Sequence, residues 1–152
     1  MSIAYRYTRD INLSQDFLQE SFIIIFKKLN QFDSNIGNFE GWTAKILINK
    51  ILEQKRKARE LYFEDYIDLE PIVENPIFHK LSVDELKVEI AKLPEIYRII
   101  LQLHYFDEFS HAEIAKILEI EASSSRSRLT RAKQLITARW RHLQTVNNHE
   151  VK

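Results

Sequence analysis

Residues 110–136 read SHAEIAKILEIEASSSRSRLTRAKQLI, and they give the clearest view of how the chain folds. The stretch opens with a Ser-x-x-Glu capping box, in which Ser110 and Glu113 satisfy the free amides at the start of a helix. Apolar residues then recur at three- and four-residue spacing, which predicts a short amphipathic helix. After a turn within residues 119–123, a longer helix is predicted over about residues 124–143.

This longer helix has an apolar face and a basic face. The positions predicted to face the core are Ser125, Leu129, Ala132, Leu135 and Ile136. The positions predicted to face outward are Ser124, Arg128 and Arg131, flanked by Arg126, Thr130 and Lys133. A helix fits the major groove of B-DNA, where arginine bonds guanine through two hydrogen bonds and serine bonds a base edge or a phosphate. The pattern therefore predicts a helix-turn-helix unit that binds DNA through its second helix.

The composition favours helices along the whole chain. Only two glycines and three prolines occur in 152 residues, although sheets need such residues for their turns, so we predict an all-α fold. No cysteine is present, which excludes disulfides, zinc–thiolate sites and thiol nucleophiles. The longest apolar run, residues 22–26, is too short to span a bilayer, and charged residues interrupt the start of the chain. We therefore expect a cytoplasmic protein without membrane insertion.

The net charge is zero, yet the charges are segregated along the chain. Residues 45–59 are strongly basic, and the charged residues that follow, up to position 74, are all acidic. Between residues 122 and 149 every charged side chain is basic. Two basic helical stretches are typical of a surface that binds a polyanion, whereas either one alone would favour a solvated helix face.

The first of two predicted domains, residues 1–60, is expected to hold two helices. They cover about residues 14–29 and 38–59, with a loop near residues 33–37. The stripe predicted to be buried on the first helix consists of Phe17, Leu18, Phe22, Ile25, Phe26 and Leu29.

An acidic linker and a second domain follow. Residues 61–81 contain two prolines and no helical period, and are predicted as the linker. The second domain, residues 82–145, opens with a capping box formed by Ser82 and Glu85, and residues 146–152 are predicted as a tail. Pro94 ends the first helix of this domain, and the helix that follows is predicted to bury Ile96, Ile99, Ile100, Leu103 and Phe106.

Three longer motifs can be compared with known families. Residues 93–135 read LPEIYRIILQLHYFDEFSHAEIAKILEIEASSSRSRLTRAKQL and resemble region 4 of bacterial sigma factors, most specifically at Ser127-Arg128-Leu129 and Arg131-Ala132. Residues 16–32 read DFLQESFIIIFKKLNQF and resemble region 2.2. Residues 39–59 read FEGWTAKILINKILEQKRKAR and resemble regions 2.3 and 2.4. No long domain separates them, so the chain resembles the extracytoplasmic-function (ECF) group of the sigma-70 family.

The resemblance implies a transcription initiation factor that binds core RNA polymerase and directs it to promoters. It assigns polymerase binding to Asp16, Gln19 and Glu20. It assigns recognition of the −10 promoter element to Phe39, Lys45, Asn49 and Lys50. There an aromatic ring stacks on an unpaired base and lysines hold phosphates. It assigns the −35 element to Ser124, Arg126, Ser127, Arg128, Thr130 and Arg131. The expected partners are core polymerase, promoter DNA and an anti-sigma factor.

The sequence departs from the family pattern at three places. Only residues 1–11 precede the region 2.2 helix, where the family has a helix hairpin, so either the native start lies upstream or the apolar stripe needs another cover. Glu119 and Ser123 stand where the family commonly has glycine, so we expect a turn in right-handed or extended backbone. His104 replaces a common arginine and is expected to weaken a phosphate contact at neutral pH.

Two other functions are consistent with these motifs. One is a stand-alone helix-turn-helix regulator that binds operator DNA as a dimer, and the other is a degenerate sigma paralogue that binds polymerase without opening promoters. The chain has no glycine-rich phosphate loop and no nucleophile elbow, so an enzyme is not predicted. Its five histidines lack the spacing of metal ligands, so neither a metal nor a cofactor is expected.

Overall fold

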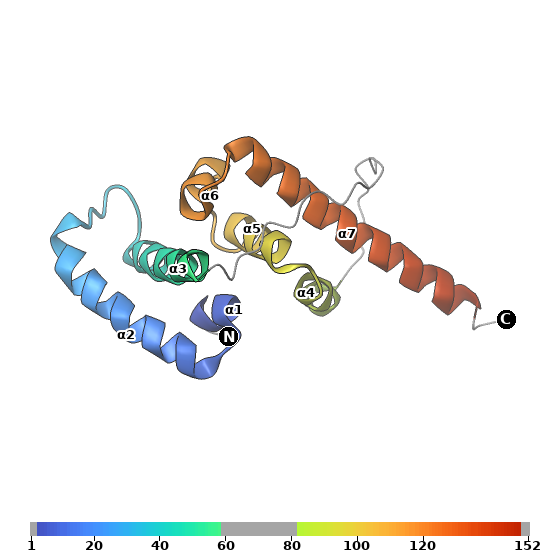
Figure 1. Cartoon of the computed structure of the whole chain (residues 1–152), viewed down its shortest axis with the longest axis horizontal. Helices are drawn as coiled ribbons and strands as arrows, with labels where there is room; N and C mark the ends of the chain where they lie inside the picture. The colour runs from blue at the N-terminus through green and yellow to red at the C-terminus, as the bar shows by residue number, and fades with distance from the viewer. Residues whose placement is uncertain (1–2, 59–81, 150–152) are drawn as a thin grey trace.

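The computed structural model describes residues 3–58 and 82–149, and every regular element within these ranges is a helix. The N-terminal helices are α1 (Ile3–Thr8), α2 (Ile11–Lys28), the short 3-10 helix η1 (Leu29–Gln31) and α3 (Phe39–Lys57). The C-terminal helices are α4 (Val83–Ala91), α5 (Glu95–Tyr105), α6 (His111–Leu118) and α7 (Ala122–His149) (Figure 1). The predicted all-α fold is confirmed, and the predicted linker lies outside the described residues. None of the described helices is long and apolar enough to cross a membrane.

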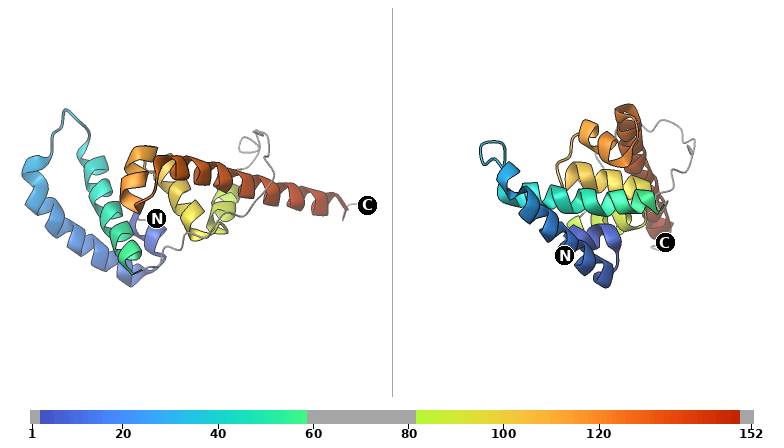
Figure 2. Two further views of the ribbon diagram at one scale, coloured as in Figure 1. Left: turned by 45° about the horizontal axis from the view of Figure 1, so that its top comes forward. Right: turned by 60° about the vertical axis from the view of Figure 1, so that its left-hand side comes forward.

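The helix starts in the C-terminal half follow from local sequence. Both predicted capping boxes are formed, because Ser82 and Glu85 bond each other's backbone amides, as do Ser110 and Glu113. Pro94 is the N-cap residue of α5. Helix α7 begins two residues before the predicted start and continues beyond the predicted end, so that its last turns extend past the other helices (Figures 1 and 2).

Helix α5 lies at the centre of the C-terminal helices and packs against α6 and α7. Seven of its eleven residues are buried, including the predicted Ile96, Ile99, Ile100 and Leu103. The prediction for Phe106 is wrong, since its ring is exposed. Phe106 is the C-cap residue of α5, where the chain leaves the helix, and helical spacing therefore no longer sets the direction of its side chain.

Helix α2 packs against α1 and α3, but its buried face differs from the predicted one. The buried positions are Ser14, Phe17, Ser21 and Ile25, while Leu18 is half-buried. Three residues of the predicted stripe are exposed, namely Phe22 at 57%, Phe26 at 74% and Leu29. These three lie about a quarter turn around the helix from the buried face, at 100° per residue. The apolar surface of α2 is thus wider than the surface that α1 and α3 cover.

Helix α3 lies between α2 and the C-terminal helices (Figures 1 and 2). It packs against α1 and α2 on one side and against α6 on the other. Its buried residues Leu47, Ile48, Ile51 and Leu52 belong to one apolar cluster that extends from Ala4 to Ile136. The N-terminal and C-terminal helices therefore share a continuous core, which brings the basic face of α3 next to the helix-turn-helix unit.

Candidate nucleic-acid interface

Helices α6 and α7 form the predicted helix-turn-helix unit. The predicted core residues Ser125, Leu129, Ala132 and Ile136 of α7 are buried, and Leu135 is half-buried. The imidazole Nδ1 of His111, the first residue of α6, lies 2.9 Å from the hydroxyl of Ser125. Apolar packing and this polar contact fix the orientation of α7 relative to α6.

The turn between the two helices contains a left-handed residue. Glu119 has a φ of 54° and is the C-cap of α6, with its amide bonded to the carbonyl of Ala115. The expectation of a right-handed or extended turn is therefore wrong. The helix ends with the left-handed geometry that is usual at C-termini, and Glu119 adopts it although glycine is favoured there. Arg56 of α3 supports this turn, because its guanidinium lies 3.0 Å from the Glu119 carboxylate and donates to the carbonyl of Ile117 at 2.6 Å.

The predicted −35 residues lie along the first three turns of α7, but they are not equally accessible. Arg126 and Thr130 are exposed, whereas Ser124, Ser127, Arg128 and Arg131 are half-buried. The prediction that Ser124, Arg128 and Arg131 face outward is therefore wrong in part. The outermost residues are Arg126 and Thr130, which were predicted on the flank. The reason is that α4, α5 and α6 all pack against α7, and this wide contact partly covers its flanks.

The electrostatics of this end of α7 favour an anion. Its first turn contains no acidic residue, and the amides of a helix N-terminus carry partial positive charge. Arg126 adds a full positive charge one turn further along. A phosphate and the adjacent base edge are the DNA groups that such a surface accommodates.

The aromatic residue predicted to contact the −10 element lies at the start of α3. Phe39 follows the N-cap residue Asn38 and is 47% exposed. Its ring centroid lies 5.2 Å from that of Phe32 and 5.8 Å from that of Trp42. The three rings form an aromatic cluster, defined here as Phe32, Phe39 and Trp42, with Phe39 as its exposed member.

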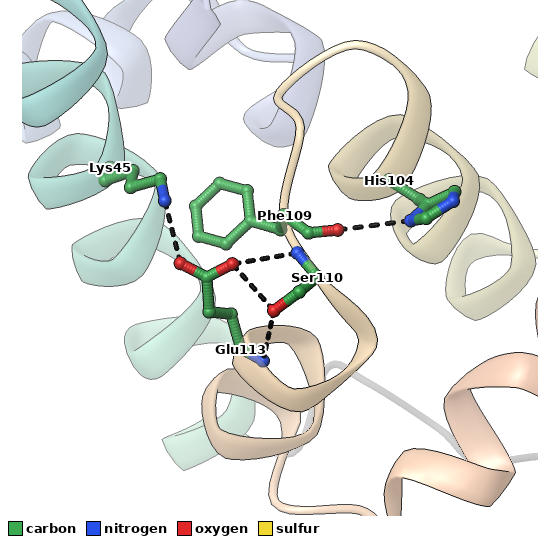
Figure 3. Close-up of polar contacts among 5 residues, drawn as sticks. All are labelled: Lys45, His104, Phe109, Ser110 and Glu113. Carbon is green, nitrogen blue, oxygen red and sulfur yellow. Dashed lines mark hydrogen bonds and ion pairs between the residues drawn. The ribbon is translucent and has the colours of Figure 1, made fainter. Parts of the chain in front are cut away.

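The two predicted −10 lysines are engaged in ion pairs. Lys50 lies 2.8 Å from the carboxylate of Glu20 on α2. Lys45 donates to Oε1 of Glu113 at 2.7 Å, and its ammonium lies 5.0 Å from the ring centroid of Phe109 (Figure 3). The hydrogen bonds from Lys45 and from the Ser110 amide lower the pKa of Glu113 to about 2. The carboxylate is therefore ionised at neutral pH.

The remaining predicted residues of the N-terminal helices are on the surface. Asn49, the fourth predicted −10 residue, is exposed on α3. Asp16, Gln19 and Glu20, the predicted polymerase contacts, are all exposed on α2. The ion pair between Glu20 and Lys50 links the predicted polymerase face to the predicted −10 face.

Besides the pair between Lys45 and Glu113, three ion pairs between the N-terminal and C-terminal halves were not predicted from the sequence. Arg6 contacts Asp107 at 2.9 Å, Lys55 contacts Glu95 at 2.9 Å, and Arg56 contacts Glu119. No local pattern reveals such partners, because they lie between 40 and 101 positions apart. The segregation of acids and bases along the chain was the only available signal.

His104 is packed within the C-terminal helices. Its Nδ1 lies 3.1 Å from the carbonyl oxygen of Phe109, and its ring stacks on that of His111 with centroids 4.6 Å apart. Burial, followed by the charges of His104 and Arg126, lowers the pKa of His111. Among the side chains of residues 3–58 and 82–142, no group of three or more histidine, aspartate and glutamate residues is arranged to hold a metal ion.

Comparison with known proteins gives a consistent result for both halves. The family described as Sigma-70 region 2 matches residues 1–60, and the one described as Sigma-70, region 4 matches residues 84–136. The ECF RNA polymerase sigma factor SigW of Bacillus subtilis is 28% identical, over 93% of this chain and 82% of its own. The RNA polymerase sigma factor NccH of Alcaligenes xylosoxydans is 30% identical, over 81% of this chain and 70% of its own.

A solved structure shares the fold. It is the sigma factor RpoE of Bartonella quintana, crystallised with the anti-sigma factor NepR. The two structures superpose with a TM-score of 0.54 at 22% sequence identity, covering 90% of this chain and 86% of the other.

Proposed function

Because this chain belongs to the sigma-70 family, in its extracytoplasmic-function group, we propose that α7 reads the −35 promoter element and α3 the −10 element. The chain is a transcription initiation factor, a class of non-enzymatic proteins that direct RNA polymerase to promoters. A stand-alone regulator is not favoured, because it leaves the region 2 match unexplained. The observation that carries the proposal is an exposed arginine near the N-terminus of α7 in a formed helix-turn-helix unit.

For the −35 element, the exposed pair Arg126 and Thr130 are the proposed base contacts. They are one turn apart on α7, and arginine discriminates guanine through two hydrogen bonds. The half-buried Ser124, Ser127, Arg128 and Arg131 flank this pair and are proposed to contact phosphates.

For the −10 element, Phe39 is proposed to stack on an unpaired base, since it is the exposed ring of the aromatic cluster. Asn49 is exposed further along α3 and is proposed to contact DNA directly. Lys45 and Lys50 reach phosphates only when they leave Glu113 and Glu20.

The remaining assignments are also proposals. Asp16, Gln19 and Glu20 of α2 bind core polymerase, and an anti-sigma factor is a further partner, as NepR is for RpoE. Residues 1–60 and 82–145 act as two domains joined by the acidic linker. The protein works in the cytoplasm, reaches the nucleoid with polymerase, and has no catalytic activity of its own.

The proposal is tested by sequencing the transcripts that core polymerase and this protein produce from a library of randomised promoters. The wild-type chain should enrich two sequence elements upstream of the start sites. Arg126→Ala should relax the upstream element alone, lowering discrimination about 5- to 150-fold at one base pair, since a good arginine–guanine contact contributes about 1–3 kcal/mol. Phe39→Ala should reduce the enrichment of the downstream element alone.

The matched control is Lys87→Ala, which removes an exposed base of α4 that pairs with Asp84 on its own helix. It should leave both elements unchanged. Relaxation of both elements by Arg126→Ala would contradict the assignment of α7. Binding to polymerase without any transcript would instead support the degenerate sigma paralogue.

A further inference from the structure

A polar residue, Ser125, lies on the buried face of α7. It is fully buried and shares this face with Leu129, Ala132 and Ile136. Burying a hydroxyl is unfavourable unless the hydroxyl is hydrogen-bonded. The hydroxyl of Ser125 lies 2.9 Å from Nδ1 of His111, the first residue of α6. This contact joins the start of α6 to the start of α7.

The imidazole of His111 is itself held in place by α5. Its ring stacks on that of His104, with the centroids 4.6 Å apart and an angle of 16° between the ring planes. Nδ1 of His104 lies 3.1 Å from the carbonyl oxygen of Phe109 (Figure 3). Because a carbonyl oxygen only accepts hydrogen bonds, this Nδ1 is the donor. His104 is thus fixed at Nδ1 and gives His111 a fixed ring on which to stack.

Ser125 lies between two residues that are proposed to contact the −35 element. Ser124 precedes it, and the exposed Arg126 follows it. Arginine recognises guanine through two hydrogen bonds at once. Such a contact tolerates a displacement of only about 0.5 Å. The contact between Ser125 and His111 therefore sets where Arg126 meets the base edge.

The charges around His111 favour its neutral form. Burial, followed by His104 on α5 and Arg126 on α7, lowers its pKa. Its ring also lies at the start of α6 and against the start of α7, and helix N-termini carry partial positive charge. On its own helix the carboxylate of Glu113 is bonded to Lys45 of α3. A proton on His111 therefore adds a positive charge that repels the start of α7.

We propose that His111 is a positioning residue for −35 recognition, and that its neutral imidazole holds the start of α7, through Ser125, where Arg126 reads DNA. The inference deepens the proposed function and rests on it in taking α7 as the −35 helix. Protonation of His111 displaces the start of α7 from α6, so −35 recognition weakens as the pH falls. Recognition of the −10 element by α3 does not change.

The first test is transcription by core polymerase and the full chain from promoters with a matched or a mismatched −35 element. The ratio of the two transcripts is the −35 discrimination. His111→Phe keeps a ring and removes the polar atom, whereas Ser125→Ala removes the hydroxyl. At pH 7.5 each should lower the discrimination about fivefold, the effect of one lost hydrogen bond. His111→Asn should stay within about twofold of the wild-type chain, because its amide can still bond Ser125.

The double variant His111→Phe/Ser125→Ala tests whether the two residues act together. It should lower the discrimination only about as much as either single change, because neither polar partner is left unpaired. Multiplying effects, or no effect of either single change, would overturn the inference. A variant that fails to fold would also lose −10 discrimination, and the smaller change Ser125→Ala then decides the test.

His142→Phe is the matched control for His111→Phe. His142 is an exposed histidine of α7, far from the start of that helix. Its replacement should leave both the −35 and the −10 discrimination unchanged. A loss of −35 discrimination equal to that in His111→Phe would overturn the inference.

A pH profile separates positioning by His111 from simple packing. Between pH 7.5 and pH 5.5 the −35 discrimination of the wild-type chain should fall about two- to fivefold, whereas that of His111→Asn should stay level. Identical profiles in the two proteins would overturn the inference. So would a rise in the wild-type discrimination on acidification, because it would mean that the imidazolium contacts a DNA phosphate.

Nuclear magnetic resonance of the free protein tests the same contact without DNA. The amide signals of Ser124, Ser125 and Arg126 should titrate with the same midpoint as the ring of His111, and His111→Asn should abolish this titration. Amide signals that do not follow His111 would overturn the inference. Failure of the proposed function gives a different result, because Arg126→Ala would then leave −35 discrimination unchanged while these signals still follow His111.

Discussion

The C-terminal and N-terminal helices bury their apolar surfaces to different extents. Helix α5 is packed by α6 and α7 and buries most of its residues. Helix α2 has an apolar face of comparable width, yet Phe22 and Phe26 are exposed on it. Periodicity in a sequence identifies which face of a helix is apolar, but burial depends on whether another element covers that face. Periodicity predicts an apolar face on each of the two helices, but it does not show that part of the apolar surface of α2 stays uncovered.

The largest expected difference concerns core packing. Leu103→Ala, at a fully buried position of α5, should lower the free energy of unfolding by about 2–5 kcal/mol, because it removes buried methyl groups and leaves a cavity. Phe26→Ala should change it by less than about 0.5 kcal/mol, because the ring is already in contact with solvent. Urea denaturation, monitored by circular dichroism, gives the free energy of unfolding of both variants. A loss of several kcal/mol in Phe26→Ala would mean that another element covers α2 in solution.

A smaller effect is expected at the capping boxes, which sharpen the comparison within the C-terminal half. Ser110→Ala should cost about 1 kcal/mol of stability, since it leaves an amide at the start of α6 without its acceptor. Ser82→Ala removes the same hydrogen bond at the start of α4, which lies at the edge of the fold and packs against α7. Thermal unfolding of the two variants compares the stability that each serine cap contributes. A change of less than about 0.3 kcal/mol in Ser110→Ala would show that the cap contributes nothing to α6.

The smallest effect is a pH dependence confined to the C-terminal helices. The pKa of His111 is lowered by burial and by the neighbouring His104 and Arg126, while Ser125 contacts its ring. Below the ordinary histidine pKa of about 6.5, the unfolded chain takes up a proton that the folded chain resists, so stability should fall as the pH falls below that value. Between pH 7 and pH 5.5 the wild-type chain should lose more stability than His111→Asn, as measured by urea denaturation. If the free energy of unfolding falls equally with pH in the two proteins, His111 does not cause the loss of stability.

Much of the C-terminal half was predictable because its signals are local. Both capping boxes, the core of α5 and the helix-turn-helix pattern depend on residues within a few positions of one another. The left-handed backbone of Glu119 was missed although glycine is common there in the family, and only its contact with Arg56, more than sixty positions away, had no local signal. The residues predicted to be most exposed on α7 were only partly right, because the sequence does not show how many helices pack against α7. The ion pairs of Lys45 and Lys50 depend on tertiary structure in the same way.

Run-off transcription with purified core polymerase tests the central claim most directly. The account predicts that polymerase with this protein makes promoter-dependent transcripts that polymerase alone does not make, and that Arg126→Ala reduces them about fivefold or more at promoters with an intact −35 element. Sequence-specific DNA binding without polymerase, together with no transcript in its presence, would contradict the account and support a stand-alone regulator.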